Sequence, residues 1–149
     1  MTDTLGVIAP VPGRVLGLAD VPDPVFAQQI VGSGVAVDPE RVPGVAVAPI
    51  AGRLLKLHPH AFVVLTAEGK GVLVHLGIDT VQLDGKGFEL MATEGDEVEA
   101  GDPIVHWDPS AVEADGRSPV VPVVVMDTAA DSISASSVGR TVAVGDPLF

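Results

Sequence analysis

Short runs of Val, Ile and Leu, each ended by Gly, Pro or Asp, recur along the whole chain. The clearest are GRVLGLA, GVAVD, GRLLKL, AFVVLT, GVLVHL, PIVHW and VVPVVVM. Seventeen Gly and thirteen Pro argue against long helices, and turns at this spacing are typical of an antiparallel sandwich or barrel. Several runs are apolar at every position, which indicates strands covered on both faces. We therefore expect an all-β fold, an antiparallel β-sandwich or barrel, with a helical turn or two in PVFAQQIVGSG and PSAVEADGRS.

Two pairs of segments repeat in a consistent order. Residues 9–18 and 48–57 share the frame A-P-x-x-G-R-x-L-x-L, and residues 98–104 and 142–148 share V-x-x-G-D-P. Turns rich in Gly and Pro resemble one another by chance, but two matched pairs in the same order favour a duplicated β motif. The length of 149 residues predicts a single domain, residues 1–149, with a sizeable core.

The charge balance excludes several classes of partner. Twenty Asp and Glu against eight Lys and Arg give a net charge of −12, which repels phosphate backbones and anionic membrane surfaces. We therefore expect no nucleic acid, and a protein partner with a basic patch would be attracted. The first ten residues lack the charged region of a signal peptide, and no apolar run is long enough to span a bilayer. These features predict a cytoplasmic protein without direct membrane insertion.

Two histidines stand near the ends of neighbouring strand-like runs. His75 lies within VLVHLGIDTV, and His60 lies upstream beyond the turn signal AEGKG. In a hairpin with a two-residue E-G loop or a four-residue A-E-G-K loop, His60 lies opposite Gly77 and is the diagonal neighbour of His75 on the same face. A three-residue loop would place the two histidines on opposite faces. The runs are apolar throughout and do not settle the register, although the commonest loops bring the imidazoles together.

Neighbouring imidazoles have a limited set of uses. They bind metal ions, or one acts as a nucleophile while the other donates to a developing negative charge. The chain has no cysteine, so it has neither disulfides nor a thiolate site. It has no G-K-[ST] phosphate loop either. His106 is interpreted as an edge residue, and the polar segment DSISASS, residues 131–137, as a connection without chemistry.

Long stretches of this sequence resemble one family. They are HAF, VHLGIDTVQLDGKGF, EGDEVEAGD, PDPVFAQQIVGSGVAV and the two A-P-x-x-G-R segments, which together cover nearly the whole chain. They resemble the glucose-type IIA phosphocarrier of the bacterial phosphoenolpyruvate-dependent sugar phosphotransferase system. The resemblance implies a β-sandwich of the duplicated hybrid motif type. It also implies a cytoplasmic phosphotransferase component that supports sugar uptake and can bind regulatory protein targets. That component accepts a phosphoryl group from HPr, the histidine-containing phosphocarrier protein, and passes it to the IIB domain of a sugar permease.

The resemblance also assigns site residues. It makes His75 the phosphorylated nucleophile, on Nε2, and His60 the residue that stabilises the phosphoryl group. The backbone carbonyl of Gly77 would accept from the other nitrogen of His75, and Asp23 and Asp79 would flank the site and meet an arginine of HPr. The implied apolar docking face comprises Val25, Phe26, Ile30, Val31 and Val81. No cofactor is required, although zinc can be shared by His60, His75 and an acid of a partner.

The sequence departs from the family pattern at three positions. His58 stands where a threonine is usual, and Leu73 and Leu76 replace aromatic residues. These differences predict a docking face adapted to different partners. The sugar, the permease and any regulatory targets cannot be read from the sequence, because a IIA domain does not contact the sugar.

Three alternative functions share parts of this pattern. LytM-type zinc peptidases carry H-x-G-x-D and H-x-H, which occur here as HLGID and HPH but in the opposite order, and zinc retained by His58, His60, His75 and Asp79 would favour them. A regulatory binding domain without phosphotransfer is the second, and the two intact histidines argue against it. A biotinyl or lipoyl carrier needs a lysine at a hairpin tip, and none of the lysines has the required context: Lys56, Lys70 and Lys86.

Overall fold

The computed structural model describes residues 6–149, so the signal-peptide prediction falls partly outside the described residues. The strands are β1 (Gly13–Gly17), β2 (Gly32–Pro39), β3 (Gly44–Val47), β4 (Gly52–His58), β5 (Ala61–Leu65), β6 (Gly71–His75), β7 (Phe88–Leu90), β8 (Glu97–Val98), β9 (Pro103–Trp107), β10 (Val121–Met126) and β11 (Thr141–Val142). The helices are η1 (Leu18–Asp20), α1 (Pro24–Ala27), η2 (Thr80–Leu83) and α2 (Pro109–Ala114), where η denotes a 3-10 turn. The all-β prediction is confirmed.

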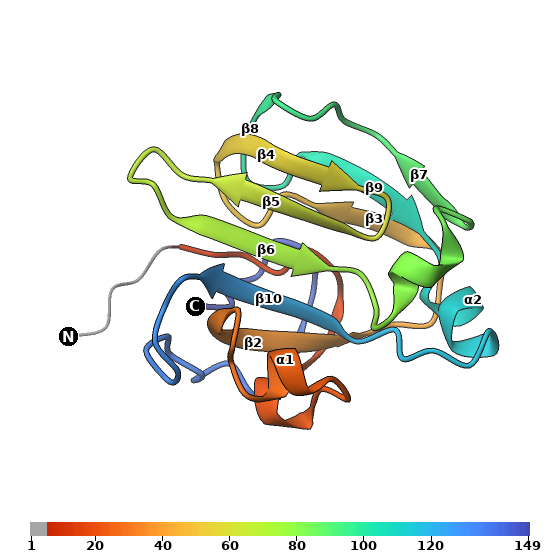
Figure 1. Ribbon diagram of the computed structural model, residues 1–149, viewed down its shortest axis with the longest axis horizontal. Coiled ribbons are helices and arrows are strands. Elements are labelled where there is room, and N and C mark those ends of the chain that lie inside the picture. The colour runs from red at the N-terminus through yellow and green to blue at the C-terminus, as the bar shows by residue number, and fades with distance from the viewer. Residues whose placement is uncertain (1–5) are drawn as a thin grey trace.

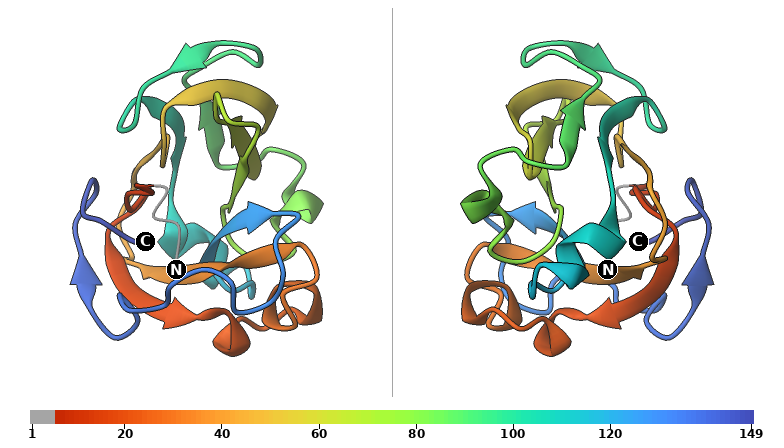
Figure 2. Two further views of the ribbon diagram at one scale, coloured as in Figure 1. Left: turned by 90° about the vertical axis from the view of Figure 1, so that its left-hand side faces the viewer. Right: turned by 90° about the vertical axis from the view of Figure 1, so that its right-hand side faces the viewer.

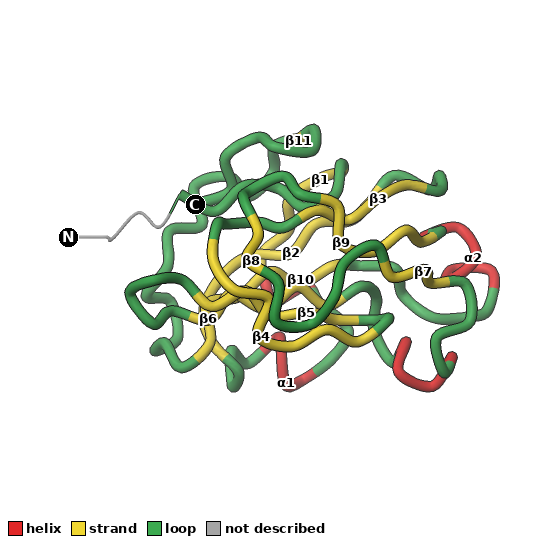
Figure 3. Tube along the Cα trace, turned by 90° about the horizontal axis from the view of Figure 1, so that it is seen from above, coloured by secondary structure: helices red, strands yellow, loops and turns green. Residues whose placement is uncertain are grey.

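The strands form two antiparallel sheets. The larger has eight strands in the order β11-β1-β2-β10-β6-β5-β4-β8, and the smaller has the order β3-β9-β7. Figure 1 shows β6 and β10 side by side in the middle of the larger sheet, and Figure 2 shows this sheet curling around the interior. Seen from above, most of the chain is strand or loop, with α1 and α2 as short helical turns in the connections (Figure 3). The sandwich prediction is therefore confirmed.

The repeated sequence segments occupy equivalent places in the larger sheet. In each copy, the Gly of the first segment pairs across the ladder with the Val of the second: Gly13 with Val142 and Gly52 with Val98. The alanine of each first segment donates its N–H to the aspartate carbonyl of the second at 2.8 Å, in both copies. The eight-strand order is thus two four-strand units, β11-β1-β2-β10 and β8-β4-β5-β6, joined between β10 and β6.

The glycine of the repeated G-R pair is required by close backbone approach. A Cβ at Gly13 would lie 2.0 Å from the carbonyl oxygen of Asp38, and one at Gly52 would lie 2.3 Å from that of Leu65. Side-chain atoms are excluded at such distances, so only glycine allows the neighbouring strand to pair this closely. The same residue meets the same constraint in both units.

Alternating residues of the central strands fill two separate clusters. On β10, Val123 and Val125 belong to the main core, whereas Val124 belongs to a second cluster on the opposite face. Leu73 of β6 likewise packs against the second cluster, and Val72 and Val74 face the main core. Strands buried on both faces explain why these runs are apolar at every position. The second cluster is covered by η1 and α1, and it places α1 beside the end of β6.

Asp-Pro pairs begin both α-helices. Asp23 Oδ1 accepts from the N–H of Val25 at 2.8 Å, and Asp108 Oδ1 accepts from that of Ser110 at 3.0 Å. Each aspartate is an N-cap, and the following proline is suited to the first helical position. The structure thus places helices in both segments for which the sequence predicted them. Within residues 6–149, no helix combines the length and the hydrophobicity that crossing a bilayer would require.

Candidate functional site

His75 is the last residue of β6 and projects from the face of the sheet that α1 covers. Its Nδ1 lies 2.5 Å from the carbonyl oxygen of Gly77, so the N–H is held at Nδ1 and the lone pair is left on Nε2. Burial lowers the pKa of His75 below its usual value, although the Gly77 contact and the charges of Asp23 and Asp79 act in the opposite direction. The ring is therefore neutral near pH 7.

The turn that follows His75 positions this carbonyl. Gly77 has φ +83°, and a Cβ there would lie 2.7 Å from Cγ2 of Thr80 and 3.1 Å from the carbonyl oxygen of Ser118. Thr80 Oγ1 donates to the carbonyl of Leu76 at 2.8 Å, and the N–H of Ile78 donates to Ser118 at 2.8 Å. Hydrogen bonds therefore hold the segment L-G-I-D-T in a turn, and only glycine fits at position 77 because a Cβ would overlap its neighbours.

The β5–β6 register differs from the one that the sequence favoured. Ala61 pairs with His75, and the N–H of Thr66 donates to the carbonyl of Lys70 at 2.8 Å, which closes a three-residue loop. The expected pairing of His60 with Gly77 is therefore wrong. In a continuous strand this register would place the two histidines on opposite faces of the sheet.

The two imidazoles are nevertheless neighbours, because His60 is not in a strand. It follows Pro59 in the tight turn between β4 and β5, where the alternation of side chains is interrupted. The ring centroids of His60 and His75 are 5.3 Å apart in an edge-to-face arrangement. The carbonyl of His60 also accepts from the N–H of Leu76 at 2.7 Å, which ties the turn to the end of β6.

A third imidazole adjoins this pair. His58, the last residue of β4, stacks on His60 with ring centroids 5.7 Å apart and an interplanar angle of 23°. Burial lowers the pKa of His60, and the neighbouring imidazoles of His75 and His58 lower it further. His60 is consequently neutral near pH 7 and has a ring N–H to donate.

The two predicted acids come from separate elements. Asp23 caps α1, and Asp79 precedes η2 with a left-handed backbone conformation of φ 60°. Both charges raise the pKa of His75, which places them within electrostatic reach of its ring. The structure therefore brings both carboxylates to the rim of the histidine pair.

The predicted apolar residues divide into an exposed and a buried group. Val25, Ile30 and Val81 are exposed, with fractions of 41%, 67% and 60%. Phe26 is only 7% exposed and its ring lies 5.4 Å from that of His75, and Val31 packs against the second cluster. The outer surface is thus formed by the first group, and Phe26 and Val31 support it from beneath.

Comparisons with known proteins agree with this geometry. The family model described as the phosphoenolpyruvate-dependent sugar phosphotransferase system, EIIA 1, matches residues 5–130. The PTS system glucose-specific EIIA component of Staphylococcus aureus is 40% identical over 126 residues, which are 83% of this chain and 75% of that protein. That of Bacillus anthracis is 36% identical over 141 residues, 93% of this chain and 84% of that protein. The solved structure of the glucose permease IIA from Mycoplasma capricolum matches with a TM-score of 0.82 and 32% identity, covering 99% of this chain and 95% of that one.

This chain belongs to the EIIA 1 family. It is a phosphocarrier of the sugar phosphotransferase system, and its activity is that of a phosphotransferase component. Neither the zinc-peptidase alternative nor the purely regulatory one is supported by these comparisons. Within the described part of the chain, no group of three or more His, Asp or Glu side chains is arranged to hold a metal ion.

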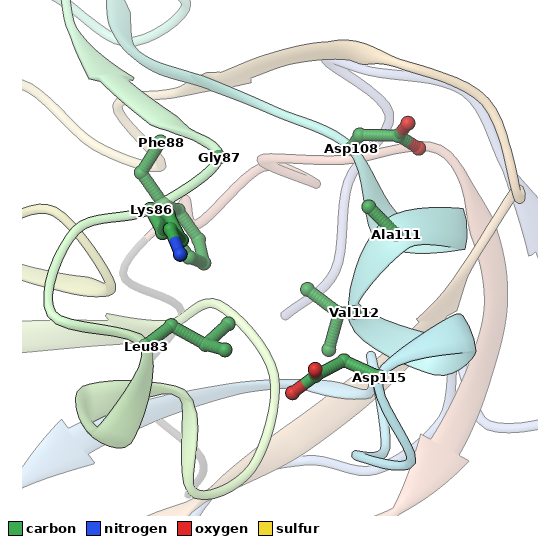
Figure 4. Close-up of a pocket in the computed structure, with 8 residues that line it drawn as sticks. All are labelled: Leu83, Lys86, Gly87, Phe88, Asp108, Ala111, Val112 and Asp115. Atoms are coloured by element: carbon green, nitrogen blue, oxygen red, sulfur yellow. The ribbon is translucent and has the colours of Figure 1, made fainter.

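None of the cavities of about 240, 410 and 140 Å³ in this EIIA protein is lined by His58, His60 or His75. A cavity of about 240 Å³ lies nearby but on the far side of η2, between η2 and α2. Figure 4 shows Leu83, Lys86 and Phe88 on one side of it and Ala111, Val112 and Asp115 on the other.

Arg117 is a site-supporting residue that the sequence analysis missed. Its Nε donates to the carbonyl of Asp79 at 3.2 Å, its Nη2 donates to Gln82 at 2.9 Å, and the guanidinium pairs with Asp115. It thereby ties the segment that carries Asp79 to the end of α2. No local motif marks this arginine, because its side-chain hydrogen bonds to Asp79 and Gln82 cross a long sequence separation.

Proposed function

We propose that His75 carries the phosphoryl group, bonded to Nε2. The observation that carries this assignment is the 2.5 Å contact between Nδ1 of His75 and the carbonyl of Gly77. Because that contact holds the proton on Nδ1 and burial keeps the ring neutral, the Nε2 lone pair is available to attack phosphorus. As the new nitrogen–phosphorus bond forms, the bond to the donor's histidine nitrogen breaks, so the phosphoryl group is exchanged between imidazoles.

His60 would act on the phosphoryl oxygens without forming a bond to phosphorus. Its ring is edge-on to that of His75 at 5.3 Å, and it is neutral, so it can donate one N–H toward a group on Nε2. Phosphoryl transfer proceeds through a loose, highly charged transition state in which positioning and electrostatics supply the catalysis. A fixed donor beside the transferring group is therefore the expected role.

The surroundings of the histidines support a protein donor and a protein acceptor. Asp23 and Asp79 provide negative charge at the rim, and Val25, Ile30 and Val81 provide exposed apolar contacts. Such a surface suits HPr, whose arginine would meet the carboxylates, and then the IIB domain of a permease. The names of the relatives support glucose as the sugar. We place this exchange in the cytoplasm and assign it to residues 1–149 as one domain, with regulatory protein targets as further partners.

Zinc shared with a partner is compatible with the donor set. His60 and His75 supply two neutral imidazoles, and Nδ1 of His75 is held by a backbone carbonyl, as is usual for histidines that bind metals. Two further ligands for a tetrahedral site would come from the partner. Zinc would there supply cross-linking of the two proteins, and it is not required for phosphoryl transfer.

The test is incubation with phosphoenolpyruvate, enzyme I and HPr, followed by intact-mass measurement and site mapping. We expect one phosphoryl group, labile in acid and stable in base, on His75. His75→Gln should abolish labelling, whereas the control His106→Gln, on the exposed side of β9, should label as the unmodified protein does. Labelling of His60 or His58 in the His75→Gln protein would overturn the assignment.

A further inference from the structure

A cavity of about 410 Å³ lies far from the histidines. It is within the size range of small-molecule sites, about 300–1,000 Å³, whereas cavities of about 240 and 140 Å³ elsewhere are smaller. In Figure 1 the loop after β10 and the last residues of the chain lie at the end of the molecule opposite α2. The lining residues share this end: Gly6, Val7, Ile8, Ser134, Ser136, Ser137, Arg140, Pro147, Leu148 and Phe149.

One side of this cavity is polar and comes from a single loop. Ser137 is 4% exposed, and its Oγ is buried with no hydrogen-bond partner among the described residues. Buried hydroxyls are normally paired, because an unpaired one has lost its contact with water without compensation. Ser134 and Ser136 add two more hydroxyls, and Arg140 adds a guanidinium that no described acidic side chain pairs with.

The opposite side is apolar and largely rigid. Val7 and Leu148 are almost completely buried. The N–H of Val7 donates to the carbonyl of Phe149 at 2.9 Å, and the N–H of Leu148 donates to the carbonyl of Val7 at 2.8 Å. Ile8 and Pro147 form a β-bridge beside them. The cavity therefore joins hydroxyls and one cation on one side to an aliphatic wall on the other.

The polar loop is held in place by contacts outside the cavity. The carbonyl of Arg140 accepts from the N–H of Val15 at 2.8 Å, and the N–H of Gly139 donates to Val15 at 2.9 Å. The N–H of Ile133 donates to Ser33 Oγ at 3.1 Å. These bonds fix both ends of the serine segment to β1 and β2, so the polar side is preorganised without a ligand.

We propose that this cavity is a binding site for a small aliphatic monocarboxylate. The carboxylate would pair with the Arg140 guanidinium, and the Ser137 hydroxyl, which is buried in the free protein, would turn out to meet it. The tail would lie over Ile8 and Pro147. Guanidinium groups recognise carboxylates through paired hydrogen bonds. Arg140 is the one cation among the residues that line the cavity, and the chain as a whole carries a net charge of −12. The cavity therefore favours an anion with one negative charge over anions with more. This site is independent of the phosphoryl chemistry proposed for His75, and it gives chemistry to a segment that the sequence indicated only as a connection.

The experiment uses octanoate as the probe and the isotopically labelled full chain. Octanoate is titrated while backbone amide resonances are followed, with octan-1-ol as the neutral analogue of equal chain length. We expect saturable shifts confined to residues 6–8, 134–140 and 147–149, and affinity for octan-1-ol at least about tenfold weaker, because a charge-assisted pair is lost. Equal affinity for the two probes, or shifts scattered over the surface, would overturn the proposal.

Two variants and one control separate binding from folding. Arg140→Gln should weaken the binding of octanoate about tenfold. The control is Arg53→Gln, which changes an exposed arginine on β4 and should leave the affinity for octanoate unchanged. Ser137→Ala should weaken octanoate severalfold while leaving the melting temperature of the free protein equal or higher, because it removes an unpaired buried hydroxyl. A Ser137→Ala protein that melts lower and binds octanoate unchanged would show a structural hydroxyl and overturn the assignment. Phosphorylation of His75 should be unaffected in all three.

Discussion

The hairpin β1–β2 and the hairpin β4–β5 occupy equivalent places in the sheet and have different connections. Both begin at a glycine pressed against a neighbouring carbonyl, and both pair with a V-x-x-G-D-P segment in the same register. The β4–β5 connection is the two-residue turn that holds His60, whereas the β1–β2 connection runs over residues 18–31 and includes η1 and α1. The repeated parts therefore make the scaffold, and the unlike connections make the site.

The two connections also supply different chemistry. The short one is rigid and presents an imidazole beside the end of β6, and the long one presents a capping carboxylate and apolar side chains beside the same histidine. None of the four histidines lies in β11, β1, β2 or β10 or in the connection of residues 18–31, so the first unit contributes charge and contact surface but no titratable ring. The candidate site of this pseudo-symmetric fold thus lies where its two units meet.

The largest effect is expected from removing the imidazole of the short connection. His60→Gln should still be phosphorylated on His75, but onward transfer to IIB should slow by on the order of 10²–10³-fold, or about 3–4 kcal/mol, because a donor to the transferring group is lost. A single-turnover chase of the phosphorylated variant measures this rate. The double variant His58→Gln with His60→Gln should be slower still, since His58 stacks on His60. Transfer at the unmodified rate would remove His60 from the mechanism, and a variant without label would move the acceptor to His60.

The repeated glycines Gly13 and Gly52 test whether the two units are equivalent in stability. Gly13→Ala and Gly52→Ala should each lower the free energy of unfolding by about 1–3 kcal/mol, because the new methyl group overlaps a backbone oxygen that cannot move alone. Urea denaturation measures both. Gly17→Ala is the control, since its Cβ would meet nothing within 4 Å, and a change within about 0.5 kcal/mol is expected there. Losses as small as that control would show that close approach does not hold the strands together.

The acids of the two units should act alike and modestly. Asp23→Asn and Asp79→Asn should each weaken binding to HPr by about two- to fivefold, and raising salt should reduce the difference, because rim charges act mainly on association. Asn caps helices as well as Asp does, so α1 should be retained. Asp146→Asn is a matched control. The carboxylate of Asp146 also accepts a backbone N–H, that of Ala143, but it lies in the turn after β11. If Asp146→Asn weakens binding to HPr as much as Asp23→Asn and Asp79→Asn do, the effect comes from the net charge of the protein and not from contacts at the proposed docking surface.

The pH dependence of stability should trace to the second unit. The folded pKa values of His60 and His75 are lowered, so the unfolded chain binds more protons below about pH 6.5 and the free energy of unfolding falls as the pH drops through that region. Above that region both states are neutral and the contribution vanishes. Urea midpoints between pH 8 and pH 5 measure the slope, which should be shallower in a protein with both His60→Gln and His75→Gln. An unchanged slope would assign the dependence to other groups.

Much of this fold could be predicted from the sequence because its signals are local. Gly and Pro mark the turns, continuous apolar runs mark strands covered on both faces, and the Asp-Pro pairs at residues 23 and 108 mark two helix starts. The β5–β6 register could not be predicted, since a slip of one residue exchanges one apolar face for another. The proximity of His60 and His75 was expected on a register that proved wrong, and it arises instead from a turn.

The sequence by itself determined the seven longest strands, the duplication and the histidines of the candidate site. Each depends on residue types and spacings that act within a few neighbours along the chain. Only the tertiary structure decided that His60 meets His75 from a turn, that Arg117 braces the segment carrying Asp79, and that the unpaired Ser137 lines the same cavity as Arg140. These features depend on which strands and connections are neighbours in space. The packing of the whole chain decides that, because no spacing along the sequence specifies it.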